Sequence, residues 1–443
     1  MKKILLSLIT ILMPLALLAQ QAGDNFTIKT TDGKTTEWSL AGDSKNGDIS
    51  TIKHKSNQLI LYAKGYEGIE WATYDIDKIE SITFNVFHKG SYVEESAAQA
   101  VKNMGIGTNF GNCTDVVAMW MNMNSNSVTD FEKAWGQEPT TKPMVDFLKK
   151  NGFNSVRIPV TWFQHMKADG TVDKAWMNRI QEIVDYVIDN GMYCILNVHH
   201  DTGADSDDVK HWIKADEANY KENKEKFESL WTQIATRFKN YDQHLVFEGY
   251  NEMLDADNTW NAPKNANSYK GLNGYAQSFV NAVRATGGNN ETRNLIVNTY
   301  AAACGDEVLN NLTIPTDKVD GHIAVEVHTY APWDWFAQKG KWDASCSNEI
   351  KNMFTRLNNK FISKGIPCII GEYGTHGSRS VSKKSSASEI QAAADQAADI
   401  VKQAKAYGVA TFYWMSIFDG TDRSVPQWTL PTVVEAMKKA YNE

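Results

Sequence analysis

The sequence predicts an α/β protein, a (β/α)8 TIM barrel preceded by a small N-terminal all-β module. Two observations lead to this fold class. Beyond residue 100, eight apolar runs of strand length alternate with long helical patterns, and several runs are nearly continuous in Val, Ile and Leu. Such runs are typical of parallel strands that are covered on both faces. A doubly wound sheet usually has fewer strands and often carries a Gly-rich phosphate turn, and the sequence contains no G-x-G-x-x-G.

The elements of the barrel follow from the positions of these runs. Strands are expected at 105–110, 155–160, 193–200, 245–251, 295–300, 322–330, 367–374 and 409–416. Helices are expected between most of them, at 142–151, 174–190, 219–240, 273–286, 347–364 and 387–407, with a last helix at 431–441. Residues 100–443 thus form the predicted barrel domain.

The start of the chain is typical of a secretory signal peptide, residues 1–19. Lys2 and Lys3 precede an apolar run at 4–18, and Ala19 precedes two Gln residues. The run is shorter than the roughly 20 residues that span a bilayer. We expect cleavage after Ala19, no membrane anchor, and a secreted or periplasmic mature protein.

Residues 24–86 predict a small β-rich module of unknown role. Alternating polar and apolar residues are interrupted there by Asp-Gly and Asn-Gly turns, which favours short antiparallel strands. Four aromatic residues of the module could form a sugar-binding face or its core: Trp38, Tyr62, Tyr66 and Trp71. Residues 87–99 show little periodicity and are expected to form a linker.

Composition limits the partners. The 443 residues are 42% hydrophobic and 22% charged, and 45 Lys+Arg against 53 Asp+Glu give a net charge of −8. Because no basic cluster occurs, a nucleic-acid partner is not expected.

We expect a monomer. Five Cys without a C-x-x-C favour buried thiols over a disulfide framework or a zinc ribbon.

Functional residues of a TIM barrel lie at the carboxyl ends of its strands. Here those ends are unusually polar, although polar groups are costly to bury unpaired. The residues concerned are Arg157, His199, His200, Asn251, Glu252, His328, Tyr330, Glu372 and Trp414.

Glu252 and Glu372 are carboxylates at the ends of the fourth and seventh strands, so they face each other across the barrel mouth. Hydrolysis of a glycosidic bond needs one carboxylic acid to protonate the leaving oxygen and a second carboxylate to attack the anomeric carbon or activate water. The sequence therefore predicts a glycosidase. Glu248 and Glu326 lie deeper in strands four and six, where they are expected to pair with Arg157 or a His.

The surroundings predict different roles for the two carboxylates. Arg157 and Tyr330 can hold Glu372 ionised as the nucleophile. Glu252, near that charge and partly desolvated, should have a raised pKa and act as general acid, tuned by His328. Asn251 and His199 can hydrogen-bond sugar hydroxyls.

Several Trp residues fall in or next to predicted β/α loops, where sugar rings could stack on them, and this arrangement favours an endo mode. They are Trp120, Trp135, Trp162, Trp212, Trp260, Trp333 and Trp335. Trp176 and Trp231 fall inside amphipathic helices and are expected in the core.

The motifs resemble glycoside hydrolase family 5, most closely its subfamily 4 endo-β-1,4-glucanases and xyloglucanases. The resembling segments include NFGNCTD from Asn109, NVHHD from Asn197, YDQHLVFEGYNE from Tyr241, VHTYAPWDW from Val327, GEYGT from Gly371 and YWMSIFDG from Tyr413. They run in order from residue 100 to the end of the chain. Two departures occur: Met253 stands where Pro is common, and Cys113-Thr114-Asp115 stands where many members have Thr-Leu-Asp.

The resemblance implies a retaining double displacement on β-glucans, with Glu252 as acid/base, Glu372 as nucleophile and no metal or cofactor. By the family pattern the −1 subsite, which holds the sugar whose bond is cut, is completed by Arg157, His199, Asn251, His328, Tyr330 and Trp414. We also expect Asn109, His200, Trp120 and Trp333 to contact substrate.

Three alternatives stay open at this stage. One is an endo-β-1,4-mannanase or xylanase on the same scaffold. Another is a metal-dependent TIM-barrel hydrolase with His199, His200 and His328 as ligands. The third is a polysaccharide-binding protein that has lost hydrolysis.

Overall fold

Eight parallel strands form a closed barrel in the computed structural model, which describes residues 25–39, 49–63, 70–85, 92–330, 332, 342–375 and 380–443. The strands are β7 (Ile106–Asn109), β8 (Ser155–Ile158), β9 (Tyr193–Asn197), β10 (Leu245–Glu248), β11 (Leu295–Asn298), β12 (Ile323–Thr329), β13 (Cys368–Tyr373) and β14 (Ala410–Tyr413). They pair in chain order, and β14 pairs with β7 to close the barrel. Each strand lies inside a predicted run, so the predicted fold class is confirmed.

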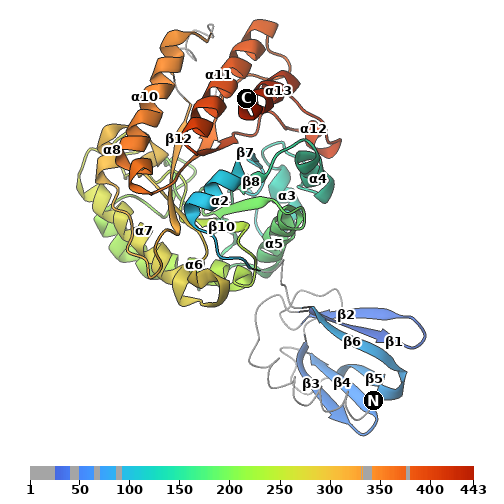
Figure 1. Ribbon diagram of the computed structural model, residues 1–443. Coiled ribbons are helices and arrows are strands. Elements are labelled where there is room, and N and C mark those ends of the chain that lie inside the picture. The colour runs from blue at the N-terminus through green and yellow to red at the C-terminus, as the bar shows by residue number, and fades with distance from the viewer. Residues whose placement is uncertain are drawn as a thin grey trace.

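Helices surround the barrel (Figure 1). The seven that were predicted are α4 (Lys142–Lys150), α5 (Lys174–Ile188), α6 (Glu217–Phe238), α7 (Asn267–Ala285), α10 (Ala344–Lys360), α11 (Ala387–Ala406) and α13 (Pro431–Asn442). Shorter helices, which were not predicted, are α3 (Val128–Lys133), α8 (Asp306–Asn311) and α12 (Thr421–Ser424). Asp173, Asp216 and Asp343 begin α5, α6 and α10, because each side chain accepts backbone N–H groups of the first turn. Trp176 and Trp231 are buried as predicted.

One further helix, α2 (Ala97–Met104), closes the amino end of the barrel. Its buried residues form an apolar cluster with the strand starts, comprising Ala97, Ala100, Val101, Met104, Tyr193, Ile195, Val246, Ile296, Ala324, Ile369, Ala410 and Phe412. The helix begins inside the segment expected to be a linker, and Glu95 just before it accepts a hydrogen bond from Asn294 through its backbone oxygen. The apolar cluster fills the barrel at this end, so polar chemistry is confined to the opposite end, the barrel mouth.

The N-terminal module consists of two three-stranded antiparallel sheets. One has the order β2 (Thr35–Ser39), β1 (Asn25–Thr30), β6 (Ile79–Asn85), and the other β3 (Ile49–Lys55), β4 (Gln58–Ala63), β5 (Glu70–Asp75). Trp38 is 5% exposed in the core and donates its indole N–H to Tyr74, whereas Trp71 is 47% exposed. Because Trp38 packs in the core, the four aromatic residues do not share one open face. Tyr66 lies outside the described residues.

The five Cys are unpaired, and four are buried. No described helix has the length and apolar character that a membrane crossing requires. Residues 1–19 lie outside the described residues, so the signal peptide stays a prediction.

Candidate active site

Glu252 and Glu372 meet at the barrel mouth on either side of His328. Glu372 is the fifth residue of β13, and Glu252 lies in the loop after β10. The Nδ1 atom of His328 is 2.9 Å from Glu252 Oε1 and 3.6 Å from Glu372 Oε2. One carboxylate oxygen of each Glu lies within 4.8 Å of the other. The two carboxylates predicted from strands four and seven are therefore neighbours in the fold.

Arg157 holds the base of this site together. Its fully buried guanidinium donates to both carboxylate oxygens of Glu248, at 2.7 and 2.8 Å, and to Glu372 Oε1 at 2.9 Å. It also donates to Asn109 Oδ1 at 3.0 Å and Asn251 Oδ1 at 2.8 Å. A planar guanidinium can satisfy several acceptors at fixed angles, so Arg157 ties its own strand β8 to the ends of β7, β10 and β13.

Glu372 is firmly fixed. Besides Arg157, it accepts the phenol O–H of Tyr330 at 2.6 Å, and the residue is only 4% exposed. Burial raises the pKa of Glu372, and the positive charges of His328 and Arg157 offset that effect only in part.

Glu252 differs from Glu372 in exposure and in the direction of its pKa shift. Its side chain is 21% exposed toward the mouth. Burial acts to raise its pKa, but the hydrogen bond and charge of His328 outweigh burial and hold the pKa below its usual value. The expected raised pKa of Glu252 is therefore wrong for the free site: the sequence predicts that His328 tunes Glu252, but not that its hydrogen bond and charge outweigh burial. Burial lowers the pKa of His328, yet Glu372, Glu252 and Glu326 together raise it to about 10.

An aromatic floor lies beside the carboxylates. The rings of His199 and Trp414 are parallel, with centroids 5.8 Å apart and an interplanar angle of 4°. His199 Nδ1 faces the Asn197 amide nitrogen at 3.0 Å, and burial lowers the pKa of His199, so the ring is neutral. A Cβ on Gly111 would lie 2.7 Å from the Trp414 indole, so only glycine lets Trp414 take this position.

The comparisons with known proteins agree with this geometry. The sequence model "Cellulase (glycosyl hydrolase family 5)" matches residues 113–420. The chain belongs to this family. It is a glycoside hydrolase of the cellulase type.

Three relatives illustrate the likeness. A family 5 enzyme from Prevotella bryantii, solved as a point mutant in complex with a xyloglucan tetradecasaccharide, is 57% identical, with a TM-score of 0.76 over 80% of this chain and 100% of that one. A GH5-4 broad-specificity endoglucanase from an uncultured bacterium is 43% identical, with a TM-score of 0.73 over 81% of this chain and 98% of that one. The cellulase/esterase CelE of Acetivibrio thermocellus is 34% identical over 78% of this chain, which spans only 40% of that protein.

Two residues that were expected to contact substrate, Asn109 and Arg157, instead bond buried groups of the barrel. Asn109 is 1% exposed, and its amide nitrogen donates to Gly371 O at 2.9 Å while its oxygen accepts from Arg157. Both polar atoms of the Asn109 amide are therefore used by Arg157 and Gly371, and the guanidinium of Arg157 is likewise bonded to buried acceptors. Trp120 is 70% exposed in the loop after β7, as a stacking surface requires, and Trp333 lies outside the described residues.

His200 lies beside Asp115, a residue that the strand-end reasoning did not select. His200 Nε2 is 3.8 Å from Asp115 Oδ2, an atom that has no hydrogen-bond partner within the described ranges. Burial raises the pKa of Asp115 to about 6 and lowers that of His200 to about 4. Gly111 and Asp115 both belong to the NFGNCTD segment, and a closer look at the residues that follow the first strand could have found them.

Two groups of three metal-ligand types occur in the described part of the chain: Asp115, His199 and His200, and Glu252, His328 and Glu372. In the second group, His328 already bonds Glu252, and Glu372 bonds Arg157 and Tyr330. These contacts suit acid–base chemistry, and the absence of a metal remains a prediction, which the assay below tests with a chelator.

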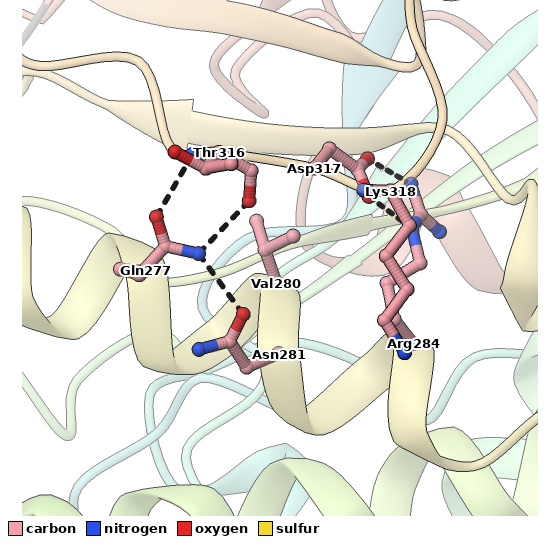
Figure 2. Close-up of a pocket in the computed structure, with 7 residues that line it drawn as sticks. All are labelled: Gln277, Val280, Asn281, Arg284, Thr316, Asp317 and Lys318. Atoms are coloured by element: carbon pink, nitrogen blue, oxygen red, sulfur yellow. Dashed lines mark hydrogen bonds and ion pairs between the residues drawn. The ribbon is translucent and has the colours of Figure 1, made fainter.

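A separate pocket of about 380 Å³ lies between α7 and the segment before β12, near the amino end of that strand (Figure 2). Its polar groups bond one another: Gln277 bonds Thr316 and Asn281, and Arg284 pairs with Asp317 at 2.7 Å. The Gln277 and Arg284 side chains of this pocket are thus already engaged within it.

Replacing Arg157 by Met should destabilise the family 5 barrel by about 3–5 kcal/mol, because Glu248, Glu326 and Glu372 lose their shared cation in a buried place. The pKa values of Glu326 and Glu372, which burial already raises, would then rise further above the unfolded values. Groups shifted in this direction lose stability as pH rises, so the deficit should be larger at about pH 8 than at about pH 5.

Urea unfolding of Arg157→Met at both pH values measures this effect. Arg179→Met is the matched control, because Arg179 pairs with buried Glu132 at 2.6 Å outside the mouth. The control should lose stability while keeping turnover. An Arg157→Met protein with wild-type stability would contradict the bracing role of Arg157.

Proposed function

We propose that the chain is a secreted, retaining endo-β-1,4-glucanase that hydrolyses internal bonds of β-glucans, namely mixed-linkage glucan, soluble cellulose and xyloglucan. The observation that carries this proposal is the close approach of Glu252 and Glu372: one carboxylate oxygen of each lies within 4.8 Å of the other. Retaining glycosidases separate their carboxyl groups by about 5–5.5 Å, whereas inverting enzymes leave roughly 6.5–9.5 Å for a water molecule.

In the first step, Glu372 attacks the anomeric carbon while Glu252 protonates the departing glycosidic oxygen. The glycosidic C–O bond breaks, and an ester bond joins the sugar to Glu372. In the second step, Glu252 takes a proton from water, whose oxygen attacks the anomeric carbon and releases Glu372. The 4% exposure of Glu372 and its bonds to Arg157 and Tyr330 suit a fixed nucleophile, and the more open Glu252 suits the group that must reach the leaving oxygen and then water.

His199, Asn251 and Trp414 would hold the sugar at the −1 subsite. Trp414 offers an apolar face, and the neutral His199 and the amide of Asn251 offer hydrogen bonds to hydroxyl groups. His200 lies next to His199 and is open enough to take part. Trp120 and Trp333 are proposed as stacking surfaces farther along the glucan.

The remaining parts of the proposal come from the sequence. Residues 1–19 would be removed on export, 24–86 would form a separate module, 87–99 would connect it to the catalytic domain at 100–443, and the protein would work as a monomer without cofactor, membrane anchor or nucleic acid. The P. bryantii relative crystallised with a xyloglucan oligosaccharide, and the uncultured-bacterium relative is described as a broad-specificity endoglucanase. Both support a β-1,4-glucan backbone as the substrate class.

The deciding experiment measures reducing-end release on mixed-linkage glucan, xyloglucan, xylan and mannan in parallel, with EDTA present and Glu372→Gln as the blank. We expect activity on one or both glucans. Activity confined to mannan or xylan would replace the substrate class, and activity abolished by EDTA would favour a metal-dependent hydrolase. Binding of glucan without any release would indicate a binding protein.

A further inference from the structure

Glu326 is a carboxylate buried directly below the proposed catalytic pair. It lies on β12 and is fully buried. Its Oε1 atom is 3.2 Å from His328 Nε2 and 3.3 Å from Arg157 Nε, while Oε2 has no hydrogen-bond partner within the described residues. Burying a carboxylate is costly unless the charge is paired and hydrogen-bonded. His328 and Arg157 are the partners of Glu326, and only His328 also contacts Glu252.

The neighbouring strand leaves room for this carboxylate. A Cβ on Gly371 of β13 would lie 1.7 Å from Glu326 Oε1, so any other residue at position 371 would displace the Glu326 side chain. Gly371 directly precedes Glu372. The same strand therefore carries the proposed nucleophile and the space that admits Glu326.

His328 is held between two carboxylates, with Nε2 facing Glu326 and Nδ1 facing Glu252 at 2.9 Å. A neutral imidazole has only one N–H. Either both ring nitrogens are protonated and both carboxylates are ionised, or the ring is neutral and one carboxyl carries the proton. In both cases one proton is shared along the chain Glu326–His328–Glu252, and this proton titrates as a property of the whole chain.

The other charged and titratable groups around this chain come from every adjoining strand. They are Arg157 on β8, Glu248 on β10, Glu372 and the Tyr330 phenol beside it, and the neutral His199. Burial and the charge of Glu248 raise the pKa of Glu326 to about 7, so Glu326 is largely ionised above that pH. The negative charge of an ionised Glu326 stabilises the positively charged, doubly protonated imidazole of His328 over its neutral form.

We propose that Glu326 is a positioning residue that keeps the catalytic proton on His328, next to Glu252, in the resting enzyme. This inference rests on the proposed acid–base function of Glu252. In the first step, the proton moves from His328 Nδ1 through Glu252 to the leaving glycosidic oxygen, which leaves the imidazole neutral and Glu252 ionised. In the second step, the proton taken from water returns through Glu252 to Nδ1. Glu326 accepts the Nε2–H bond throughout, so no net proton is gained or lost.

Glu326→Gln tests the inference because it keeps the shape and removes the charge. Without this anion, the protonated form of the His328–Glu252 pair is less favoured, so the pair should lose its proton at lower pH. We expect the basic limb of the pH profile of kcat/KM to move by about 1–2 pH units toward acid. The KM for glucan should change little. The ring-nitrogen NMR shifts of His328, which need no activity, should move their titration in the same direction.

Two variants control for a merely structural effect. Glu326→Asp keeps the charge and should return the basic limb most of the way toward wild type, and it serves as the folded comparison if Glu326→Gln is unstable. Glu248→Gln removes a carboxylate that bonds Arg157 rather than His328, and it should shift the limb less. A folded Glu326→Gln enzyme with an unchanged basic limb and unchanged His328 titration would overturn the inference. Inactivity of the wild-type enzyme on every glycan would instead refute the proposed function, while the NMR titration would still test Glu326.

Discussion

Glu372→Gln should lose nearly all turnover, by about 10⁴-fold or more in kcat, while still binding glucan. The amide keeps the shape of the side chain, but it lacks the charge and the nucleophilicity needed to attack the anomeric carbon. The Gln amide oxygen can still accept hydrogen bonds of the kind that Arg157 and Tyr330 donate to Glu372, so the exchange should leave the barrel folded. Reducing-end release gives the rate, and isothermal titration with a cello-oligosaccharide gives the affinity.

Glu132→Gln is the matched control for this variant. Glu132 is also a fully buried carboxylate bonded to an arginine, but it pairs with Arg179 on α5. It should lose some stability and keep its turnover. Normal polysaccharide turnover by Glu372→Gln, or equal losses in both variants, would reject Glu372 as the nucleophile.

Glu252→Ala should behave differently, because an acid is dispensable when the leaving group departs unaided. We expect a loss of about 10²–10⁴-fold on polysaccharide. An aryl glucoside of an acidic phenol should still form the glycosyl-enzyme at a rate near wild type, followed by slow hydrolysis. Stopped-flow release of the phenol should therefore show a burst.

Added azide separates the two roles by stereochemistry. In Glu252→Ala, azide attacks the glycosyl-enzyme and should give a β-glycosyl azide with the original configuration. In a variant of Glu372 that lacks the carboxylate, azide would replace the nucleophile and give the α product. An α-azide from Glu252→Ala would exchange the two assignments.

The fold was predictable because each strand and helix is encoded by the order of apolar and polar residues within a short stretch of the chain. The eight strand runs and seven longer helices needed only the apolar pattern along the chain, and all were found. Helix α2 was missed because it is short and two of its four buried residues are Ala97 and Ala100, whose role depends on the open barrel end that they fill.

The candidate site was predictable in its residue types and only partly in its electrostatics. The position of Glu252 and Glu372 at strand ends follows from the barrel topology. The direction of the Glu252 pKa shift does not follow, because it depends on which carboxylates surround His328 at distances of 2.9 to 3.6 Å. Asn109 was expected at the substrate, but its amide is used by Arg157 and Gly371, as only the assembled strands reveal.

The sequence by itself determined the barrel, the two carboxylates and the polar residues at strand ends, since strand periodicity and the order of motifs along the chain are local properties. The tertiary structure alone decided how charge is shared among Arg157, Glu248, Glu326, His328 and the two proposed catalytic residues. Coulomb interactions and desolvation depend on separations of a few ångströms between residues that are distant along the chain. Those separations exist only once the barrel has closed.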